Sequence, residues 1–246
     1  MDDITAAKII IRCLDLTSLN NNDNEAKIIK LCQRAQTPYG NVAAVCVYPK
    51  FVKLCNEVLP KNSNIAIATV INFPKAQDDI SKVIADINSA KKLGANELDV
   101  VFPYKHFLDK DYTFCKTFID EVVKETGKRH TLKIILETGE LKTSRLISEA
   151  TNLCLKRGVN FIKTSTGKTD ISATPEAANT ILETILSSKT NAGFKASGGI
   201  KTINDAKKYL ILAKLIMGSK WLSQDHFRIG ASSLLDDLIK VIERGY

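Results

Sequence analysis

The chain alternates short runs of β-branched and apolar residues with longer segments of helical periodicity, and this alternation limits the folds open to it. Strands that alternate with helices are typical of a parallel sheet joined by helical crossovers. Eight such strands predict a single (β/α)8 TIM barrel rather than an open, doubly wound sheet. The expected strands cover residues 9–15, 42–48, 65–71, 97–102, 132–137, 160–165, 193–197 and 227–231.

The segments between these runs have the periodicity and end signals of helices. In segment 23–36 the apolar positions fall on a single stripe. Segment 174–188 begins with Thr174, a good N-cap, and has Pro175 at its first helical position. No G-x-G-x-x-G follows the first strand, so a dinucleotide-binding sheet lacks its main signature. No linker divides the chain, and we therefore expect one barrel domain over residues 1–246.

Composition and charge exclude several classes of protein. The net charge of +8 is spread along the chain, without the aromatic–basic motifs of nucleic-acid modules, so we expect no nucleic-acid partner. The apolar runs fall far short of the ~20 residues that cross a bilayer, so we expect no membrane partner. The N-terminus has no secretory signal pattern, which favours a cytoplasmic location.

The cysteines carry no pattern of a metal site or a disulfide framework. Six of them are scattered along the chain, with no C-x-x-C pair and no neighbouring histidine cluster. Small buried residues in a reducing compartment are the simplest interpretation. We therefore expect no metal.

Two lysines lie inside apolar runs that otherwise have the pattern of buried strands. They are Lys163, in "FIKTSTGK", and Lys195, in "GFKASGGI". Lysine is rarely buried without a partner, and a charge among the outer helices would be costly, so both lysines are expected to point into the barrel mouth. Asp15, Asp99 and Glu137 lie at or near the ends of other strands, where barrel enzymes carry their active sites. The sequence predicts a pocket of two lysines and two carboxylates.

Such a pocket can support Schiff-base chemistry. A free lysine amine has a pKa near ~10.4, but burial and a neighbouring cation both lower it. The neutral amine can attack a carbonyl and form an imine, which withdraws electrons as a class I aldolase requires, without a metal. Asp99 is the preferred proton carrier, with Glu137 and Asp15 as alternatives. A static ion network is the competing interpretation, and spacing alone does not rank Lys163 above Lys195.

Glycines and serines after the last three strands predict a phosphate site. The motifs are "TSTGK", "SGG" and "GASSLL". Glycine allows close backbone approach, and a helix N-terminus offers free N–H groups to an anion. Loops after strands seven and eight are the usual phosphate site of a barrel. A phosphorylated carbonyl compound is therefore the expected substrate.

Eight motifs in order along the chain resemble the deoxyribose-phosphate aldolase family. They are "LDLTSLN", "NVAAVCVYP", "ATVINFP", "ELDVVFPY", "ILETGEL", "FIKTSTGK", "GFKASGGI" and "RIGASSLL". The resemblance implies reversible cleavage of 2-deoxy-D-ribose 5-phosphate to acetaldehyde and D-glyceraldehyde 3-phosphate, in deoxyribose phosphate catabolism and without a cofactor. The implied partners are this small phosphorylated sugar and acetaldehyde, and a homodimer is one assembly open to the chain.

The resemblance also implies a role for each matching residue. Lys163 becomes the Schiff-base lysine, Lys195 the cation that lowers its pKa, and Asp99 the proton-transfer carboxylate. The substrate pocket takes Asp15, Thr17 and Cys46. Phosphate binding is assigned to Gly167, Lys168, Gly198, Gly199, Ser232 and Ser233.

The chain departs from many relatives at a few positions, and some alternatives stay open. Leu16 stands where many relatives have histidine, and Lys168 is apolar in part of the family. Tyr246 resembles a terminal tyrosine that closes over the pocket in some relatives, and is a candidate for proton transfer. The alternatives are a transaldolase-like barrel for longer ketose phosphates, a phosphate-binding isomerase or synthase without a covalent intermediate, and a nucleic-acid-binding protein.

Overall fold

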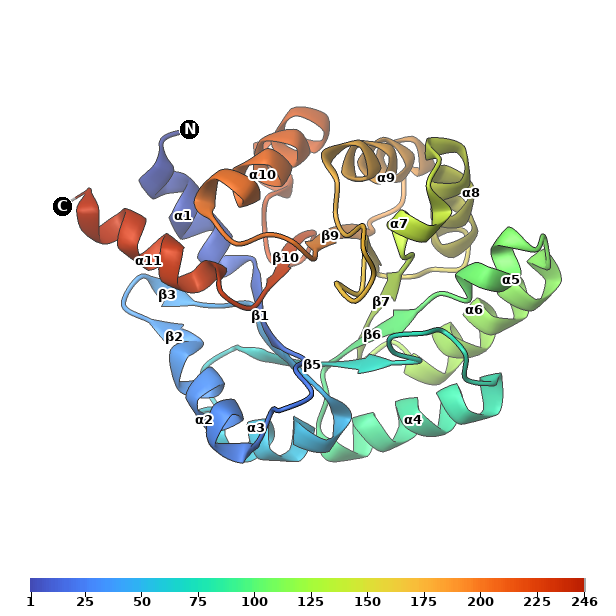
Figure 1. The fold of residues 1–246 in the computed structure, drawn as a ribbon, viewed down its shortest axis with the longest axis horizontal. Coiled ribbons are helices and arrows are strands. Elements are labelled where there is room, and N and C mark those ends of the chain that lie inside the picture. Colours follow the sequence, from blue (N-terminus) through green and yellow to red (C-terminus); the bar gives the residue numbers. More distant parts are fainter. Residues whose placement is uncertain (246) are drawn as a thin grey trace.

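A closed ring of eight parallel strands forms the centre of the molecule (Figure 1). The computed structural model describes residues 1–245. Each strand pairs with the next barrel strand along the chain, and the first pairs with the last, which confirms the predicted single (β/α)8 TIM barrel. The barrel strands are β1 (Leu14–Ser18), β4 (Ala44–Val47), β5 (Ala66–Ile71), β6 (Glu97–Val101), β7 (Thr131–Ile135), β8 (Phe161–Lys163), β9 (Gly193–Ser197) and β10 (Phe227–Ala231).

Helices surround this ring, and the first and last of them, α1 (Asp3–Arg12) and α11 (Leu234–Arg244), pack side by side (Figure 1). A short antiparallel pair, β2 (Gln36–Thr37) and β3 (Gly40–Asn41), lies outside the barrel. The helices are α1 (Asp3–Arg12), α2 (Glu25–Arg34), α3 (Val52–Val58), α4 (Ile80–Leu93), α5 (Tyr104–Leu108), α6 (Tyr112–Thr126), α7 (Thr138–Leu141), α8 (Ser144–Leu155), α9 (Pro175–Ser188), α10 (Ile203–Met217) and α11 (Leu234–Arg244), with short 3-10 turns η1 (Pro49–Phe51) and η2 (Ser219–Trp221).

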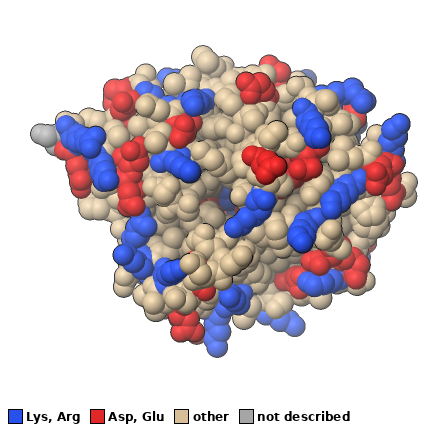
Figure 2. Space-filling view, viewed as in Figure 1, with Lys and Arg blue, Asp and Glu red and all other residues tan. Residues whose placement is uncertain are grey.

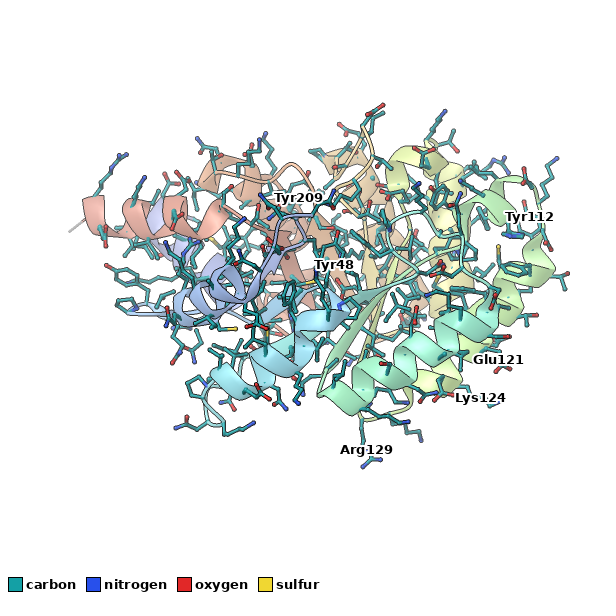
Figure 3. The ribbon with its side chains drawn as sticks, turned by 60° about the horizontal axis from the view of Figure 1, so that its bottom comes forward. Tyr48, Tyr112, Glu121, Lys124, Arg129 and Tyr209 are labelled. Atoms are coloured by element: carbon teal, nitrogen blue, oxygen red, sulfur yellow. The ribbon has the colours of Figure 1, made fainter. Side chains whose placement is uncertain are left out.

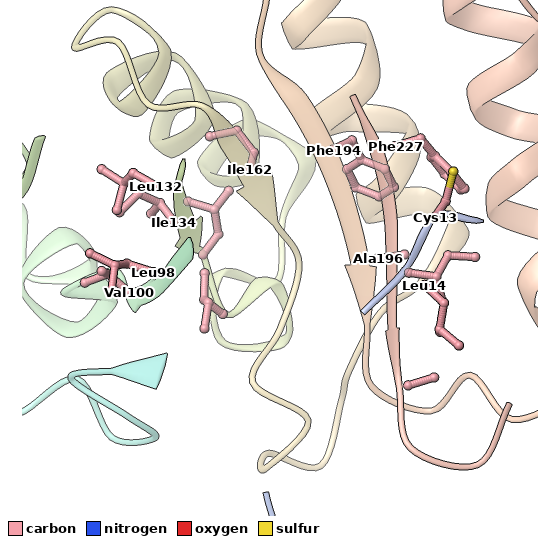
Figure 4. Close-up of a cluster of buried hydrophobic side chains, with 14 of the residues drawn as sticks. Cys13, Leu14, Leu98, Val100, Leu132, Ile134, Ile162, Phe194, Ala196 and Phe227 are labelled. Carbon is pink, nitrogen blue, oxygen red and sulfur yellow. The ribbon is translucent and has the colours of Figure 1, made fainter. Parts of the chain in front are cut away.

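Strand alternation separates an apolar outer layer from a charged interior. Figure 4 shows part of the outer layer, where side chains such as Leu98 and Leu132 belong to the buried core between strands and helices. Their immediate neighbours along the strands, Asp99 and Lys133, pair with each other instead. Because successive side chains of a strand face opposite ways, the charges lie inside the ring.

The interior is divided between two kinds of side chain. Strands β4 and β5 contribute a small apolar cluster that contains Ala44, Cys46, Ala68 and Val70. The other six strands contribute the charged side chains described below. A reactive group on β8 therefore has charges on one side and a small apolar wall on the other.

The first predicted strand, 9–15, is wrong over most of its length. Residues 9–12 belong to α1, and β1 begins at Leu14. Buried residues of α1 recur at Ala6, Ala7, Ile10 and Ile11, which is a helical period, and the helix packs against α10 and α11. Asp15 consequently lies second in its strand rather than at its end.

The outer surface carries both signs of charge. Figure 2 shows Lys and Arg interspersed with Asp and Glu over one face, which is hollowed near its centre. In Figure 3, Lys124 and Arg129 project from the outside of the molecule, whereas Tyr48 lies nearer its middle. Within residues 1–245, every helix is too short or too polar to cross a membrane.

Candidate active site

One carboxylate oxygen holds the two lysines that the sequence singled out. Asp99 Oδ2 lies 2.8 Å from Lys163 Nζ and 2.8 Å from Lys195 Nζ. Strands β8 and β9 align Lys163 directly opposite Lys195, and Asp99 comes from β6 across the barrel. Lys195 and Asp99 are fully buried, and Lys163 is only 3% exposed. The structure thus brings the three predicted residues into direct contact.

Four further charged side chains lie behind this trio. Lys133 Nζ donates to Asp99 Oδ1 at 2.8 Å and to Glu97 Oε2 at 2.5 Å. Arg228 donates to Asp15 Oδ1 at 2.6 Å and to Glu97 Oε1 at 2.8 Å. Asp15 also accepts a hydrogen bond from Lys195. The cluster thus links seven side chains: Asp15, Glu97, Asp99, Lys133, Lys163, Lys195 and Arg228.

The sequence interpretation overlooked Lys133, Arg228 and Glu97, although the signal was present. Lys133 lies within "LKIILE" and Arg228 within "FRIGA", each a charge inside an apolar strand. This is the pattern that singled out Lys163 and Lys195. Applied to every strand, it would have found all four cations.

The surroundings move the pKa values of Lys163 and Lys195 in opposite directions. Burial is the largest cause that lowers the pKa of Lys163, and nearby Lys195 lowers it further against the opposing effect of Asp99. Burial also acts to lower the pKa of Lys195, but Asp15 and Asp99 outweigh it and raise that pKa. Lys163 is therefore the amine that releases its proton more easily.

The two aspartates of the cluster stay ionised. Burial would raise the pKa of Asp99, but Lys133, Lys163 and Lys195 hold it well below its usual range. Lys195, Arg228 and Lys133 likewise lower the pKa of Asp15 against burial. The nearby thiol of Cys46 has a raised pKa, mainly through burial, and remains neutral.

A cavity of about 210 Å³ opens above the cluster, at the carboxyl ends of the strands. Of the seven clustered side chains, all within the described chain, Lys163 is the one that lines this cavity. The residues singled out from the sequence that also line it are Thr17, Gly167, Lys168, Gly198, Gly199 and Ser232, and the rest of the lining is Leu19, Asn20, Thr166, Ser197, Ile200, Lys201, Gly230 and Ala231. Asp15, Cys46 and Ser233 lie outside this lining. Tyr246 falls outside the described residues.

The rim of the cavity combines backbone turns with cationic side chains. Gly198 and Gly199 both have positive φ, at +90° and +78°, which favours glycine. Ser233 is the N-cap residue of α11, so the first turn of this helix begins beside the cavity residue Ser232. Lys168 Nζ reaches across the mouth and donates to the Leu19 carbonyl oxygen at 2.6 Å. These groups can accept an anion at the rim.

Glu137 supports the loop that carries Lys168. Its buried carboxylate accepts hydrogen bonds from Thr166 Oγ1 at 2.5 Å and from the Thr166 backbone N–H at 3.3 Å. Thr166 Oγ1 in turn accepts from the Lys168 N–H at 3.1 Å. Burial raises the pKa of Glu137 against the lowering effect of Thr166. Glu137 therefore anchors the loop after β8 rather than the lysine cluster.

A metal site requires an arrangement of ligands that the described residues do not have. Among residues 1–245 no group of three or more His, Cys, Asp or Glu side chains is arranged to hold a metal ion. The carboxylates of the cluster are occupied by lysine and arginine.

A closed barrel with a cavity at the carboxyl ends of its strands, above an amine of lowered pKa, defines a TIM-barrel enzyme. A model of the DeoC/LacD family of aldolases matches residues 9–240. The chain belongs to this family, whose members are aldehyde lyases, and the resemblance seen in the sequence is confirmed.

Solved structures agree with this assignment. A protein from Coccidioides immitis, provisionally named a deoxyribose-phosphate aldolase, is 28% identical with a TM-score of 0.84, over 95% of this chain and 86% of that one. A provisionally named deoxyribose-phosphate aldolase from Toxoplasma gondii ME49 is 22% identical, with a TM-score of 0.89 over 98% of both chains. The tetrameric deoxyribose phosphate aldolase from Aeropyrum pernix is 24% identical, with a TM-score of 0.74 over 99% and 97%.

Proposed function

We propose that this aldolase reversibly cleaves 2-deoxy-D-ribose 5-phosphate to acetaldehyde and D-glyceraldehyde 3-phosphate through a Schiff base on Lys163. One observation carries the proposal: Lys163 is the clustered lysine that both lines the cavity and has a lowered pKa. Lys195 is protonated behind it, and Asp99 bridges the two amines.

The proposed reaction starts when the neutral amine of Lys163 attacks C1 of the open-chain aldehyde. The carbinolamine takes up a proton on its oxygen and loses water to give an iminium ion. Removal of the C3 hydroxyl proton then breaks the C2–C3 bond, and its electron pair moves to the iminium as an enamine. Glyceraldehyde 3-phosphate leaves, the enamine is protonated at C2, and hydrolysis releases acetaldehyde and the free amine.

Asp99 is the proposed proton carrier in these steps. Its Oδ2 atom contacts both Lys163 Nζ and Lys195 Nζ at 2.8 Å, so a proton can pass between the amines through one oxygen. Cys46, in the apolar cluster of β4 and β5, lies on the side proposed for the acetaldehyde fragment. Asp15 keeps Lys195 in place and protonated.

The phosphate group is proposed to bind at the rim formed by the loops after β8, β9 and β10. Gly167, Gly198 and Gly199 have positive φ and expose backbone there, and the first turn of α11 begins beside Ser232. Lys168 offers a charge across the mouth. The cavity holds several polar groups beside one amine, as a small sugar phosphate requires.

The physiological role follows from the proposed reaction. We place the enzyme in deoxyribose phosphate catabolism in the cytoplasm, acting without a metal or an organic cofactor. A homodimer remains the assembly proposed for it.

Borohydride trapping tests the proposal. Protein incubated with 2-deoxyribose 5-phosphate or acetaldehyde is reduced, digested and mapped by mass spectrometry. An adduct on Lys163 is the expected result. An adduct on Lys195 would reverse the two lysine roles, and no adduct on folded protein would contradict Schiff-base chemistry. Turnover with acetaldehyde as donor separates this enzyme from a transaldolase-like barrel.

A further inference from the structure

The buried cluster contains one cation more than it has carboxylates. Its carboxylates are Asp15, Glu97 and Asp99, and its basic groups are Lys133, Lys163, Lys195 and Arg228. All seven residues are at most 5% exposed. With every group ionised the cluster carries one uncompensated positive charge, which is costly in a site shielded from water. Loss of one proton makes it neutral.

Geometry decides which basic group loses that proton. Lys133 has carboxylate partners at 2.5 and 2.8 Å, and Lys195 is bonded to both Asp15 and Asp99. Arg228 cannot be deprotonated in a protein. Lys163 has one carboxylate partner, Asp99, which it shares with Lys195. Lys163 is therefore the basic group that loses the proton and makes the cluster neutral.

The guanidinium of Arg228 is fixed in place by hydrogen bonds and by an aromatic ring. Its Nε donates to the Gln224 carbonyl oxygen at 2.5 Å, its terminal nitrogens bind Asp15 and Glu97, and its guanidinium lies 5.6 Å from the Phe161 ring centre. Neither Arg228 nor Glu97 lines the cavity. Both therefore lie beneath the cavity, where they do not touch a ligand bound in it.

We propose that Arg228 and Glu97 are positioning residues that set the protonation state of Lys163 by fixing the net charge of the buried cluster from beneath it. This proposal rests on the Schiff-base role of Lys163 proposed above. When Lys163 is neutral, removing Arg228 leaves the cluster one negative charge in excess, so Lys163 keeps its proton to higher pH. Removing Glu97 leaves one positive charge in excess, so Lys163 loses its proton at lower pH.

Other ionisable groups around Lys163 do not change this comparison. Cys46 on β4 and Glu137 after β7 interact with it, in addition to Asp99, Lys195 and the remaining cluster. Cys46 and Glu137 are intact in every variant proposed here. Any difference in the pH midpoint between variants therefore comes from the change at Arg228 or Glu97.

The test compares Arg228→Gln, Glu97→Gln, the double variant and the charge-preserving Arg228→Lys. The readout is the pH midpoint of the initial rate of borohydride-trapped adduct formation with acetaldehyde. We expect the midpoint to rise by about one unit in Arg228→Gln and to fall by about one unit in Glu97→Gln, for charges acting through a partly shielded interior. The double variant and Arg228→Lys should return close to the wild-type midpoint.

Loss of structure is distinguishable from loss of charge. A purely structural role makes the double variant at least as impaired as the single ones and leaves the midpoint unmoved. Circular dichroism identifies any variant that does not fold, and Glu97→Gln, which keeps the side-chain shape, supplies the test if Arg228→Gln is lost. Equal midpoints, or shifts of one sign in both single variants, would overturn the inference. Absence of any adduct in the wild type would instead overturn the proposed function.

Discussion

Asp99 binds two lysines through one oxygen, yet the two lysines have different environments. Lys195 gains a second carboxylate, Asp15, and its pKa rises. Lys163 has no second carboxylate within bonding distance among the described residues, borders the cavity, and its pKa falls. Two lysines on adjacent strands thus have pKa values shifted in opposite directions, because each has different charged neighbours inside the barrel.

Replacing Lys163 by leucine should abolish turnover. The substitution removes the proposed nucleophile and keeps a side chain that fits a buried site. We expect a loss of at least about a thousandfold in kcat, measured by coupled detection of glyceraldehyde 3-phosphate. Lys124→Leu, on the exposed outer side of α6, is the control and should retain full activity. Near-normal turnover in Lys163→Leu would sink the nucleophile assignment.

Replacing Lys195 by leucine should slow imine formation rather than prevent it. Without this cation the charge on Asp99 is shared by Lys163 and Lys133 only, and the repulsion from Lys195 is lost, so the Lys163 amine holds its proton more strongly. The trapping rate at pH 7 should fall by about tenfold or more and recover partly as the pH is raised. A rate that stays normal at pH 7 would contradict the pKa argument.

Lys168→Met should raise KM for the phosphorylated substrate by about tenfold, the equivalent of about 1.4 kcal/mol, and leave kcat nearly unchanged. Lys168 lies at the rim, where it binds the Leu19 carbonyl oxygen rather than the lysine cluster. Steady-state kinetics with and without the phosphate group on the sugar make the measurement. A similar loss with unphosphorylated 2-deoxyribose would show that Lys168 does not act on the phosphate.

At the residue level, a charge that interrupts an apolar strand in the sequence marks a member of the buried cluster. The pattern found Lys163 and Lys195, and it also marks Lys133 and Arg228. The network could not be derived, because pairing depends on which strands face each other across the closed ring. The bond from Arg228 to Glu97 joins residues 131 positions apart.

At the scale of elements, the loop after β8 depends on a close backbone contact. A Cβ added to Gly139 in α7 would lie 2.2 Å from the Ile171 carbonyl oxygen, so no larger residue fits unless the loop moves. We expect Gly139→Ala to displace this loop with Lys168, raising KM for the sugar phosphate. Acetaldehyde trapping on Lys163 should change little, since β8 itself is not touched.

A second glycine separates displacement from instability. Gly127, after α6, has φ +69° and nothing within 4 Å of an added Cβ, so alanine there costs backbone strain alone. Gly127→Ala should lower the thermal midpoint without changing KM. If both variants changed KM equally, the loop contact would not be the cause.

The sequence predicted the barrel strands better than the start of the chain. The short β-branched runs of the barrel strands fit a strand and lack a helical period. Ile9, Ile10 and Ile11 are different, because they have a high strand propensity and also fit the helical period of the buried residues of α1. Packing of α1 against α11 decides between the two, and that contact joins opposite ends of the sequence.

For the whole molecule, the buried carboxylates predict a loss of stability in acid. Asp15 and Asp99 have folded pKa values below the unfolded value near ~3.9, so the unfolded state binds protons first as the pH falls. Their contribution is complete at neutral pH and is lost progressively below about pH 4. Urea midpoints measured by circular dichroism between pH 7 and pH 3 should show this decline.

Asp99→Asn provides the matched comparison for that decline. The variant should be less stable than the wild type at pH 7, because three lysines lose a shared carboxylate. Its urea midpoint should also depend less on pH between 5 and 3. If the urea midpoint of Asp99→Asn fell with pH as steeply as that of the wild type, the pH dependence would come from other groups.

The pair of Asp15 and Arg228 has a consequence for how the enzyme is made in the cell. These residues are 213 positions apart, and β1 and β10 are the strands that close the ring. A chain still on the ribosome contains Lys163 before it contains Arg228, so the proposed nucleophile is synthesised before one of the charges proposed to set its protonation state. An unfinished chain that lacks β10 therefore lacks one of the charges proposed to set the protonation state of Lys163, and its proposed reactivity toward aldehydes at neutral pH is lower than that of the finished barrel.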